Sequence, residues 1–350
     1  MLKSFFSFCL AFFLVFPGFG QKGKQELKVV FYNVENLFDT IDDKHKNDNE
    51  FLPASEKEWN SERYHHKLAN LGKVLVAVDS LELPAVIGFA EVENREVLED
   101  LIRQTPLRQA PYQVLLEEGS DPRGIDVGLI FRKDKLRYLS HQALASSLEF
   151  STRNILYVRL LGPAGDTLHL FVNHWKSRSG GEEKTRPKRL ENAAMLRHAV
   201  DSLFTLDPST RILIMGDLND EPSDESVTLA LEALPVEKKP ASGELYNLFY
   251  KKYQEGSGTL WYRDWDLFDQ IIVSGNLLIR KKGNIPVINP PEGTVFNQSW
   301  MLEQSGKKGS TSLSPGDDKE AVPLRSYEYK RGYLGGFSDH LPVYVVLQYP

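Results

Sequence analysis

The chain has 350 residues, of which 41% are hydrophobic and 26% are charged, and its formal net charge is -6. This is the composition of an ordinary soluble globular protein with enough apolar material for a substantial core, so a largely disordered or membrane-embedded chain is excluded. The net acidity argues against a protein that coats polyanions non-specifically, although a local basic cleft is compatible with it.

The first 20 residues have the features of a secretory signal peptide. Lys3 precedes an apolar run over residues 5–16, and the small residues Gly18 and Gly20 stand just before Gln21, where cleavage is expected. We therefore expect an exported protein, periplasmic or secreted, whose processed form is one domain over residues 21–350. The apolar run holds the only cysteine, so the processed chain can form no disulfide and its stability depends on packing.

Short apolar runs rich in β-branched residues recur along the rest of the chain, and they predict buried strands. These runs span residues 27–32, 85–90, 126–131, 168–172, 212–215, 268–273 and 341–347. Between some of them the apolar spacing becomes helical, at residues 68–78 and 190–203. Residues 39–61 and 281–337 are polar or rich in Gly, Pro and Ser, which predicts two long loops. The alternation of strands and helices predicts an α/β fold.

Most of the buried runs begin or end at a hydrogen-bonding or metal-binding side chain. The motifs read VVFYNVEN over 29–36, VIGFAE over 86–91, FVNHWK over 171–176, IMGDLND over 214–220, FDQIIV over 268–273 and FSDHLP over 337–342. Any one of these motifs is more typical of turn chemistry when it stands alone. Together they predict polar side chains that converge at one edge of a sheet, where a binding site can form.

The residue types of this set restrict its chemistry. Without a cysteine, neither a thiol nucleophile nor a thiolate zinc site is available. Carboxylate and amide oxygens favour a hard divalent ion such as Mg²⁺ or Mn²⁺. Histidine has an ordinary pKa of about 6.5, which suits proton transfer near neutral pH. The set therefore indicates a site for a phosphate oxyanion and an activated water.

In their order along the chain, these motifs resemble those of the endonuclease/exonuclease/phosphatase superfamily, the DNase I-like proteins. The resemblance runs from Asn33 to His340 and so covers nearly the whole processed chain. It implies an α/β four-layer sandwich, in which two mixed β-sheets pack face to face with helices outside. It also implies a metal-dependent hydrolase acting on phosphate ester bonds, as a nuclease, phosphodiesterase or phosphatase.

The resemblance assigns metal ligands residue by residue. Glu91 matches the principal ligand, Asn33 lies beside it, Glu35 is a further or alternative carboxylate, and Asp339 is a carboxylate on the metal side. The expected ion is Mg²⁺ or Mn²⁺, with Ca²⁺ as an alternative.

A second group of residues carries the catalytic roles that the resemblance implies. Asp217 and Asn219 match the pair that orients the attacking water and holds the phosphate. His340 matches the catalytic histidine, and Asp269 matches the carboxylate that pairs with it. Which groups act as acid, base or oxyanion donor stays open at this point.

His174 matches a second histidine of the DNase I-like and sphingomyelinase branches, and Asp126 is the candidate for the carboxylate that orients it. The expected contacts to substrate come from Asn33, Asn219, Lys176 and Arg178. The last two belong to a basic stretch after His174, which is more often a solvated face but suits phosphate beside such a site.

We expect an exported, divalent-metal-dependent phosphoesterase, most consistent with an endonuclease-like phosphodiesterase. Glu91 is followed by Val92, Glu93 and Asn94, where DNase I-like members place a DNA-contacting arginine. That departure and the net acidity favour an alternative, a lipid or sugar-phosphate phosphodiesterase or phosphatase, sphingomyelinase-like or inositol phosphatase-like. A catalytically dead binding protein is a third alternative, disfavoured because it has no reason to keep metal ligands together with proton-transfer groups.

The expected partner is a phosphate-ester substrate, with nucleic acid among the candidates. No later apolar run is long enough for a stable membrane span, and we expect a monomer.

Overall fold

The computed structural model describes residues 25–145, 153–236, 239–280, 285–305 and 320–349. The expected signal peptide lies outside these residues. Among the helices that are described, none is both long and apolar enough to cross a membrane.

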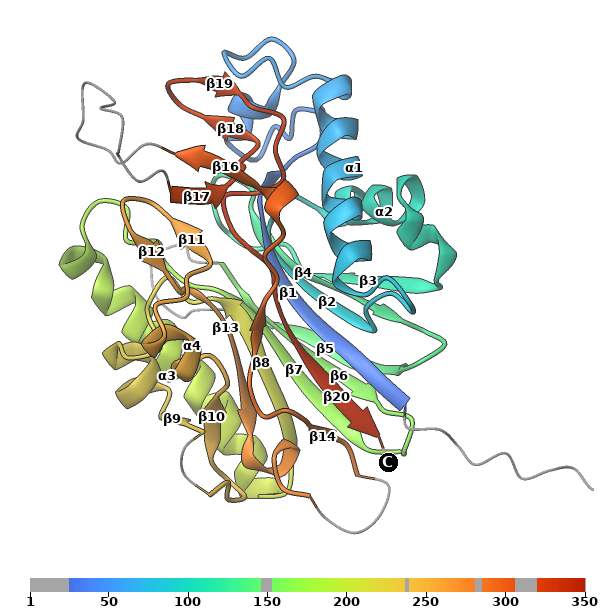
Figure 1. Cartoon of the computed structure of the whole chain (residues 1–350), viewed down its shortest axis with the longest axis vertical. Helices are drawn as coiled ribbons and strands as arrows, with labels where there is room; N and C mark the ends of the chain where they lie inside the picture. The colour runs from blue at the N-terminus through green and yellow to red at the C-terminus, as the bar shows by residue number, and fades with distance from the viewer. Residues whose placement is uncertain (1–24, 146–152, 237–238, 281–284, 306–319, 350) are drawn as a thin grey trace, which may run out of the picture.

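Two large mixed sheets organise the described residues (Figure 1). The first has the order β14-β20-β1-β2-β4-β3, and β15 also pairs with β20. Its strands are β1 (Gln25–Leu37), β2 (Val86–Val92), β3 (Tyr112–Leu116), β4 (Asp126–Arg132), β14 (Val287–Ile288), β15 (Thr294–Val295) and β20 (Val343–Tyr349). β1 runs parallel to β2 and antiparallel to β20, so the sheet is mixed.

The second sheet has the order β5-β6-β7-β8-β13-β10-β9. Its strands are β5 (Arg137–Leu144), β6 (Ile155–Leu161), β7 (Thr167–His174), β8 (Arg211–Asp217), β9 (Ala233–Pro235), β10 (Leu245–Asn247) and β13 (Asp269–Ser274). β7 and β8 are parallel, and β8 and β13 are antiparallel. The C-terminal ends of β7 and β8 and the N-terminal end of β13 therefore lie side by side at one edge of the sheet.

Helices cover the outer faces of the sheets (Figure 1). α1 (Ser61–Val78) and α2 (Arg95–Gln104) pack on the first sheet, and α3 (Glu182–Leu206) packs on the second. The side chains of Asn60 and Asn94 cap α1 and α2 by accepting a hydrogen bond from a backbone N–H three residues later, which satisfies a donor that the helix itself leaves unpaired.

The alternation of side chains along β1 shows how the layers are held together. Val29 and Phe31 belong to the apolar core between the two sheets, while Val30 and Tyr32 belong to the core under α1 and α2. All four side chains are at most 1% exposed. A strand buried on both faces reads as a continuous apolar run, which is why the sequence reveals it so clearly.

Each of the seven predicted strands corresponds to an observed strand, and both predicted helices are present. β5 and β6 have no counterpart among the predictions, and β5 in particular exposes much of its length at the edge of the sheet. The loop prediction for residues 39–61 holds apart from one short 3₁₀ turn.

The loop prediction for residues 281–337 is wrong in part, because the described portion also forms short strands. Besides β14 and β15 these are β16 (Leu302–Ser305), β17 (Glu320–Pro323), β18 (Tyr327–Glu328) and β19 (Gly332–Tyr333), which form two hairpin-like pairs. A third small pair consists of β11 (Leu260–Trp261) and β12 (Trp265–Asp266), which follow the short helix α4 (Tyr250–Gln254). Two-residue strands give no detectable period in a sequence.

Candidate active site

Three polar residues stand side by side at the edge of the second sheet because of its strand register. His174 on β7 is the register partner of Asp217 on β8, and Asp217 is the partner of Asp269 on β13. All three are at most 5% exposed. Motifs that lie almost 100 residues apart in the chain are thus brought into one row by backbone pairing alone.

The first sheet contributes Asn33 and Glu91 from the ends of β1 and β2. The register of this strand pair shifts just after Asn33, and Glu91 has a left-handed φ of 62°. Glu35, Asn36 and Asn219 also have φ between 50° and 56°. Such conformations cost free energy in residues with a side chain and cluster at functional sites, where they aim particular groups.

Asn33 connects the two sheets. Its side-chain Nδ2 donates to Asp217 Oδ2 at 3.0 Å and to Glu91 Oε1 at 3.4 Å. The other Glu91 oxygen accepts a hydrogen bond from the backbone N–H of Asn36 at 3.0 Å. One fully buried amide therefore holds two carboxylates of different sheets near each other.

His340 forms a buried pair with Asp269. The two groups are joined through Nδ1 and Oδ2 at 2.7 Å, which directs His340 Nε2 towards Asp217, 3.8 Å from its Oδ2. Burial alone would lower the pKa of His340, but the Asp269 and Asp217 carboxylates more than offset burial and hold that pKa well above its ordinary value. His340 is accordingly a cation at neutral pH.

Ser338 fixes the loop that carries His340. Its hydroxyl donates to the Asn33 carbonyl at 2.7 Å and accepts from the His340 backbone N–H at 3.1 Å. The side chain of Asp339, between them, is half-buried. Ser338 was not among the predicted site residues, although it stands in the FSDHLP motif.

His174 has different surroundings. Its Nε2 lies 3.6 Å from Asp217 Oδ2 and 3.8 Å from Glu91 Oε1, and its buried Nδ1 has no hydrogen-bond partner among the described residues. Burial lowers the pKa of His174 well below its ordinary value, and the neighbouring Arg153 guanidinium lowers it further. His174 is accordingly neutral at neutral pH.

The predicted pairing of Asp126 with His174 is not formed. Asp126 Oδ1 instead accepts a hydrogen bond from the Gly119 backbone N–H at 2.8 Å, so this carboxylate holds the turn before β4. Arg153 occupies the supporting position instead, because its guanidinium donates to the carbonyls of His174 at 3.0 Å and Trp175 at 2.6 Å. Sequence patterns gave no sign of Arg153, which follows no strand-end motif.

Asp217 and Asn219 are placed together as expected. Asp217 Oδ1 accepts from the Asn219 backbone N–H at 3.0 Å, and the Asn219 Nδ2 donates to the Trp175 carbonyl at 3.2 Å. Burial raises the pKa of Asp217 to about 7 in the protein without a metal ion, with the nearby His340 cation acting in the opposite direction.

Both carboxylate oxygens of Glu35 are already engaged by hydrogen bonds outside the cluster of Asp217, Asp269 and His340. The two oxygens accept hydrogen bonds from the backbone N–H groups of Ser326 at 2.7 Å and Tyr327 at 3.3 Å, and Lys67 Nζ lies 3.7 Å away. Lys67 is 1% exposed and also donates to the Phe337 carbonyl at 2.9 Å. The structure therefore gives Glu35 the work of anchoring the loop that leads to His340, and corrects its expected place as a metal ligand.

Arg178 is likewise engaged in holding the protein together. Its guanidinium forms ion pairs with Asp220 at 3.0 Å and Asp224 at 2.6 Å, and donates to the Asn219 carbonyl at 2.9 Å. Its predicted role as a substrate contact is not supported by this geometry. Lys176 is half-buried and has no such carboxylate partner within the described residues.

The donor atoms present fit a hard divalent cation. Asp217 and Asp269, which lie beside His340, offer carboxylate oxygens within 4.8 Å of each other, and Asp269 Oδ1 is buried without a hydrogen-bond partner in the described part of the chain. His340, protonated and paired with Asp269, has no lone pair to offer a metal ion in this state. Glu91 lies beside these carboxylates, because the Asn33 amide donates to both Glu91 and Asp217. Several carboxylates and amides in one buried cluster are the ligand set that Mg²⁺, Mn²⁺ or Ca²⁺ prefers.

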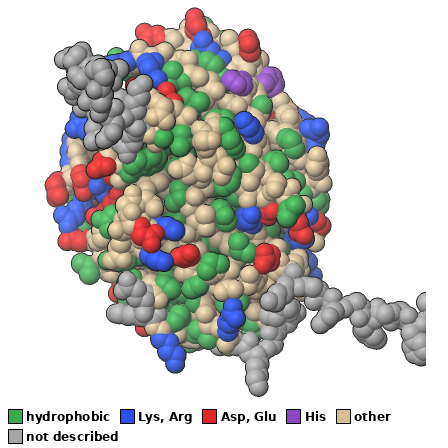
Figure 2. Space-filling view, in the orientation of Figure 1, with side chains coloured by type: hydrophobic (Ala, Val, Ile, Leu, Met, Phe, Trp, Pro, Cys, Tyr) green, Lys and Arg blue, Asp and Glu red, His purple; other side chains and the backbone are tan. Residues whose placement is uncertain are grey.

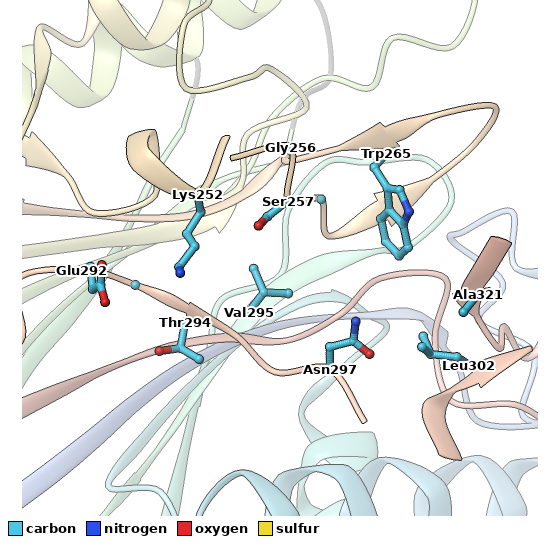
Figure 3. Close-up of a pocket in the computed structure, with 12 residues that line it drawn as sticks. Lys252, Gly256, Ser257, Trp265, Glu292, Thr294, Val295, Asn297, Leu302 and Ala321 are labelled. Atoms are coloured by element: carbon cyan, nitrogen blue, oxygen red, sulfur yellow. The ribbon is translucent and has the colours of Figure 1, made fainter. Parts of the chain in front are cut away.

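A separate cavity of about 440 Å³ is lined by other residues (Figure 3). Lys252, Ser257, Trp265 and Asn297 line it and are drawn around Val295 in this view. It adjoins the His340 segment, because Val295 pairs with Val343. The residues of the catalytic cluster do not line it.

Two sheets that each place carboxylates at one edge, with a charged and a neutral histidine beside them, define the class of the α/β-sandwich phosphoesterases. The chain belongs to the Endonuclease/Exonuclease/phosphatase family, whose model matches residues 28–349. The resemblance inferred from the motifs is thereby confirmed. No curated protein matches the chain in sequence.

Solved structures share the fold at low sequence identity. TDP2 of D. rerio, complexed with single strand DNA product, is 16% identical with a TM-score of 0.53, covering 92% of this chain and 98% of that one. A mannosyl-6-phosphatase of Bacteroides thetaiotaomicron is 15% identical with a TM-score of 0.54, covering 92% and 99%. The human Nocturnin catalytic domain with bound sulfate anion is 14% identical with a TM-score of 0.52, covering 93% and 95%. These likenesses confirm the four-layer sandwich.

Proposed function

We propose that this protein is a divalent-metal-dependent phosphoesterase that hydrolyses a phosphate ester bond by in-line attack of water. The observation that carries the proposal is the buried constellation of Asp217 between His340 and His174, with Asp269 paired to His340 at 2.7 Å. A single carboxylate flanked by a cationic and a neutral histidine suits an oxyanion that gains charge as water attacks.

Each residue of the constellation has a separate role in the proposed reaction. Asp217 accepts the hydrogen bond of the attacking water and takes its proton, aided by the raised pKa that burial gives this carboxylate. His340, held as a cation by Asp269, and His174, through Nε2, stabilise the equatorial oxygens of the phosphate. A divalent ion held by Glu91 and Asn33 would neutralise the charge that develops on the phosphate.

Metal dependence is tested through Glu91, whose oxygens face Asn33 and the Asn36 backbone N–H. We expect Glu91→Gln to keep the fold and lose most of the activity against bis-p-nitrophenyl phosphate or p-nitrophenyl phosphate, and EDTA to do the same to the unmodified protein. Circular dichroism checks the fold. Turnover at the untreated rate in both cases would show that the metal mechanism is wrong.

Two substrate classes remain in the proposal. An endonuclease-like phosphodiesterase is supported by the likeness to a TDP2 complexed with single strand DNA product, and a sugar-phosphate phosphatase by the likeness to a mannosyl-6-phosphatase. Plasmid DNA, RNA, sphingomyelin and mannose 6-phosphate, each assayed with Mg²⁺, Mn²⁺ or Ca²⁺, separate these classes. Trp300 makes an edge-to-face contact with Phe337, with ring centroids 5.2 Å apart, and packs against the core under α1 and α2, so this aromatic side chain gives no support to the lipid alternative.

The proposal includes export, supported by Lys3, the apolar run over residues 5–16 and Gly20 before Gln21. N-terminal sequencing of the protein from the cell envelope or the medium should give a chain that begins near Gln21. An active cytosolic protein that retains Met1 would overturn this part of the proposal alone.

A further inference from the structure

We infer that Arg123 and Lys176 form a subsite for a second phosphate of the substrate, beside the reaction centre on the His174 side. The inference rests on the proposed function and narrows it to substrates that carry two phosphates a short distance apart.

A continuous chain of contacts leads from the reaction centre to this subsite. Arg153 donates to the backbone carbonyls of His174 and Trp175, and its Nη1 lies 3.2 Å from Asp121 Oδ2. The side chain of Arg123 lies 3.4 Å from the same Asp121 carboxylate. Lys176 follows Trp175 directly in the chain. Arg123 and Lys176 are therefore tied to the backbone that carries His174.

Arg123, Arg153 and Lys176 carry more positive charge than their paired carboxylates offset. Among the described residues, Asp121 is the one carboxylate paired with Arg123 or Arg153, and no carboxylate is paired with Lys176. Burial lowers the pKa of Lys176, and the Arg153 and Arg123 cations lower it further, in keeping with the chain of contacts that links these residues. Like charges held together in this way repel unless an anion joins them.

The neighbouring basic residues provide a contrast. Arg178 and Arg189 both pair with Asp220, at 3.0 Å and 2.6 Å, and Arg178 pairs with Asp224 as well. Elsewhere, Figure 2 shows acidic and basic side chains interspersed over one face of the molecule. Accessible basic side chains that share one paired carboxylate, Asp121, are thus a local feature beside the active site of a protein whose formal net charge is -6.

The two cations of the subsite differ from Arg153 in being accessible. The Arg123 side chain is 53% exposed and Lys176 is half-buried, whereas the Arg153 side chain is 5% exposed. Arg153 therefore positions the group, while Arg123 and Lys176 present N–H donors to a ligand. An arginine and a lysine together bind phosphate oxygens well, because the guanidinium offers a planar pair of donors and the ammonium a point charge.

Two kinds of compound offer the required second phosphate at short range. One is a nucleic-acid strand, through the phosphate next to the scissile one, and the other is a small sugar bisphosphate. The experiment compares thymidine 5′-monophosphate with thymidine 3′,5′-bisphosphate, and glucose 6-phosphate with glucose 1,6-bisphosphate. Dissociation constants are measured by calorimetry with Mg²⁺, on protein that carries His340→Ala to suppress turnover.

We expect at least one bisphosphate to bind about tenfold more tightly than its monophosphate, as two exposed cation–phosphate contacts would give. Arg123→Gln combined with Lys176→Gln should reduce that ratio to about twofold or less. Arg103→Gln on α2 is the matched control, since its side chain is 71% exposed and pairs with Asp100 of the same helix, and it should leave the ratio unchanged. The preferred bisphosphate tells the nucleic-acid source from the sugar source.

The inference is overturned if neither bisphosphate is preferred, or if the preference survives the double substitution. These outcomes are distinct from a failure of the proposed function, which shows as absent hydrolysis of bis-p-nitrophenyl phosphate and p-nitrophenyl phosphate by the protein with His340 intact.

Discussion

His340 and His174 lie on the two sides of Asp217, 3.8 Å and 3.6 Å from its Oδ2, yet the protein shifts their pKa values in opposite directions, so that one ring is cationic and the other neutral. His340 comes from the loop before β20 and has the Asp269 carboxylate at its Nδ1. His174 ends β7, has no hydrogen-bond partner at Nδ1 within the described residues, and is backed by the Arg153 guanidinium. Burial acts on both in the same direction, so the neighbouring charge decides.

The comparison shows how one residue type can take two roles in a single site. A cationic imidazole offers a charge to the phosphate, whereas a neutral one offers only a hydrogen bond. The neighbouring charge, Asp269 beside His340 and Arg153 beside His174, determines the protonation state of each ring. Substitution of either neighbour should therefore change that state while both histidines are kept.

The largest expected effect is on the His340 side. General acid–base and charge-stabilising groups contribute about 10² to 10⁴-fold, so His340→Ala should lower kcat/KM by that much. Asp269→Asn should cost less, and the double variant little more than His340→Ala, because the two groups act as one unit. Steady-state kinetics on the three proteins checks this. Losses that multiply strictly in the double variant would separate the pair.

On the His174 side the expected loss is smaller. A neutral donor to a developing oxyanion is worth about 10²-fold, so His174→Ala should lower kcat/KM by roughly that factor. His174→Gln, which keeps a side-chain N–H, should recover part of it. If His174→Ala has full activity with the substrate that the protein turns over best, the histidine is structural.

The different protonation states of the two rings can be observed directly. In the protein freed of metal, ¹⁵N chemical shifts of labelled imidazoles should show His340 protonated well above pH 6.5, its ordinary pKa, and His174 neutral well below it. Asp269→Asn should move the His340 titration to lower pH, because it removes the largest charge that holds the proton. Coincident titration of both rings near pH 6.5 would contradict the comparison.

A third histidine tests the same rule outside the site, with the smallest expected effect. His169 on β7 bonds the Tyr157 hydroxyl, and burial followed by the Arg159 cation lowers the pKa of His169 to about 4. The unfolded chain then binds more protons than the folded one between about pH 4 and the ordinary histidine value of about 6.5. The free energy of unfolding should therefore carry no penalty from His169 above pH 6.5, and should decrease as the pH falls from 6.5 towards 4.

Urea unfolding at pH 7 and pH 4.5 measures this effect. His169 should cost the unmodified protein about 1–2 kcal/mol over that interval, after allowance for solvent screening at a partly exposed ring. His169→Gln does not titrate and should lack this component, so the gap between the two proteins should change with pH. A constant gap would mean that His169 titrates normally in the folded state.

The sequence by itself determined the strands that are buried on both faces and most of the residues at their ends. Continuous apolar runs such as 29–32 leave a strong signal, and the motifs that follow them resemble one family in order. Asn33, Glu91, Asp217, Asn219, Asp269, His174 and His340 were predicted and are brought together. The edge strand β5 and the two-residue strands were missed, since half-exposed or very short strands have no such period.

Only the tertiary structure decided what each charged side chain contacts. Glu35, Arg178 and Asp126 have the right residue type at the right position, yet each is engaged by a backbone N–H or an ion pair that holds a loop or turn. Arg153, Lys67 and Arg123 carry no motif, and their positions depend on contacts with residues far away in sequence or on a turn that packs there. The physical reason is that strand burial is a local property of sequence, whereas the partner of a charge, and with it a pKa, is settled by packing between distant segments.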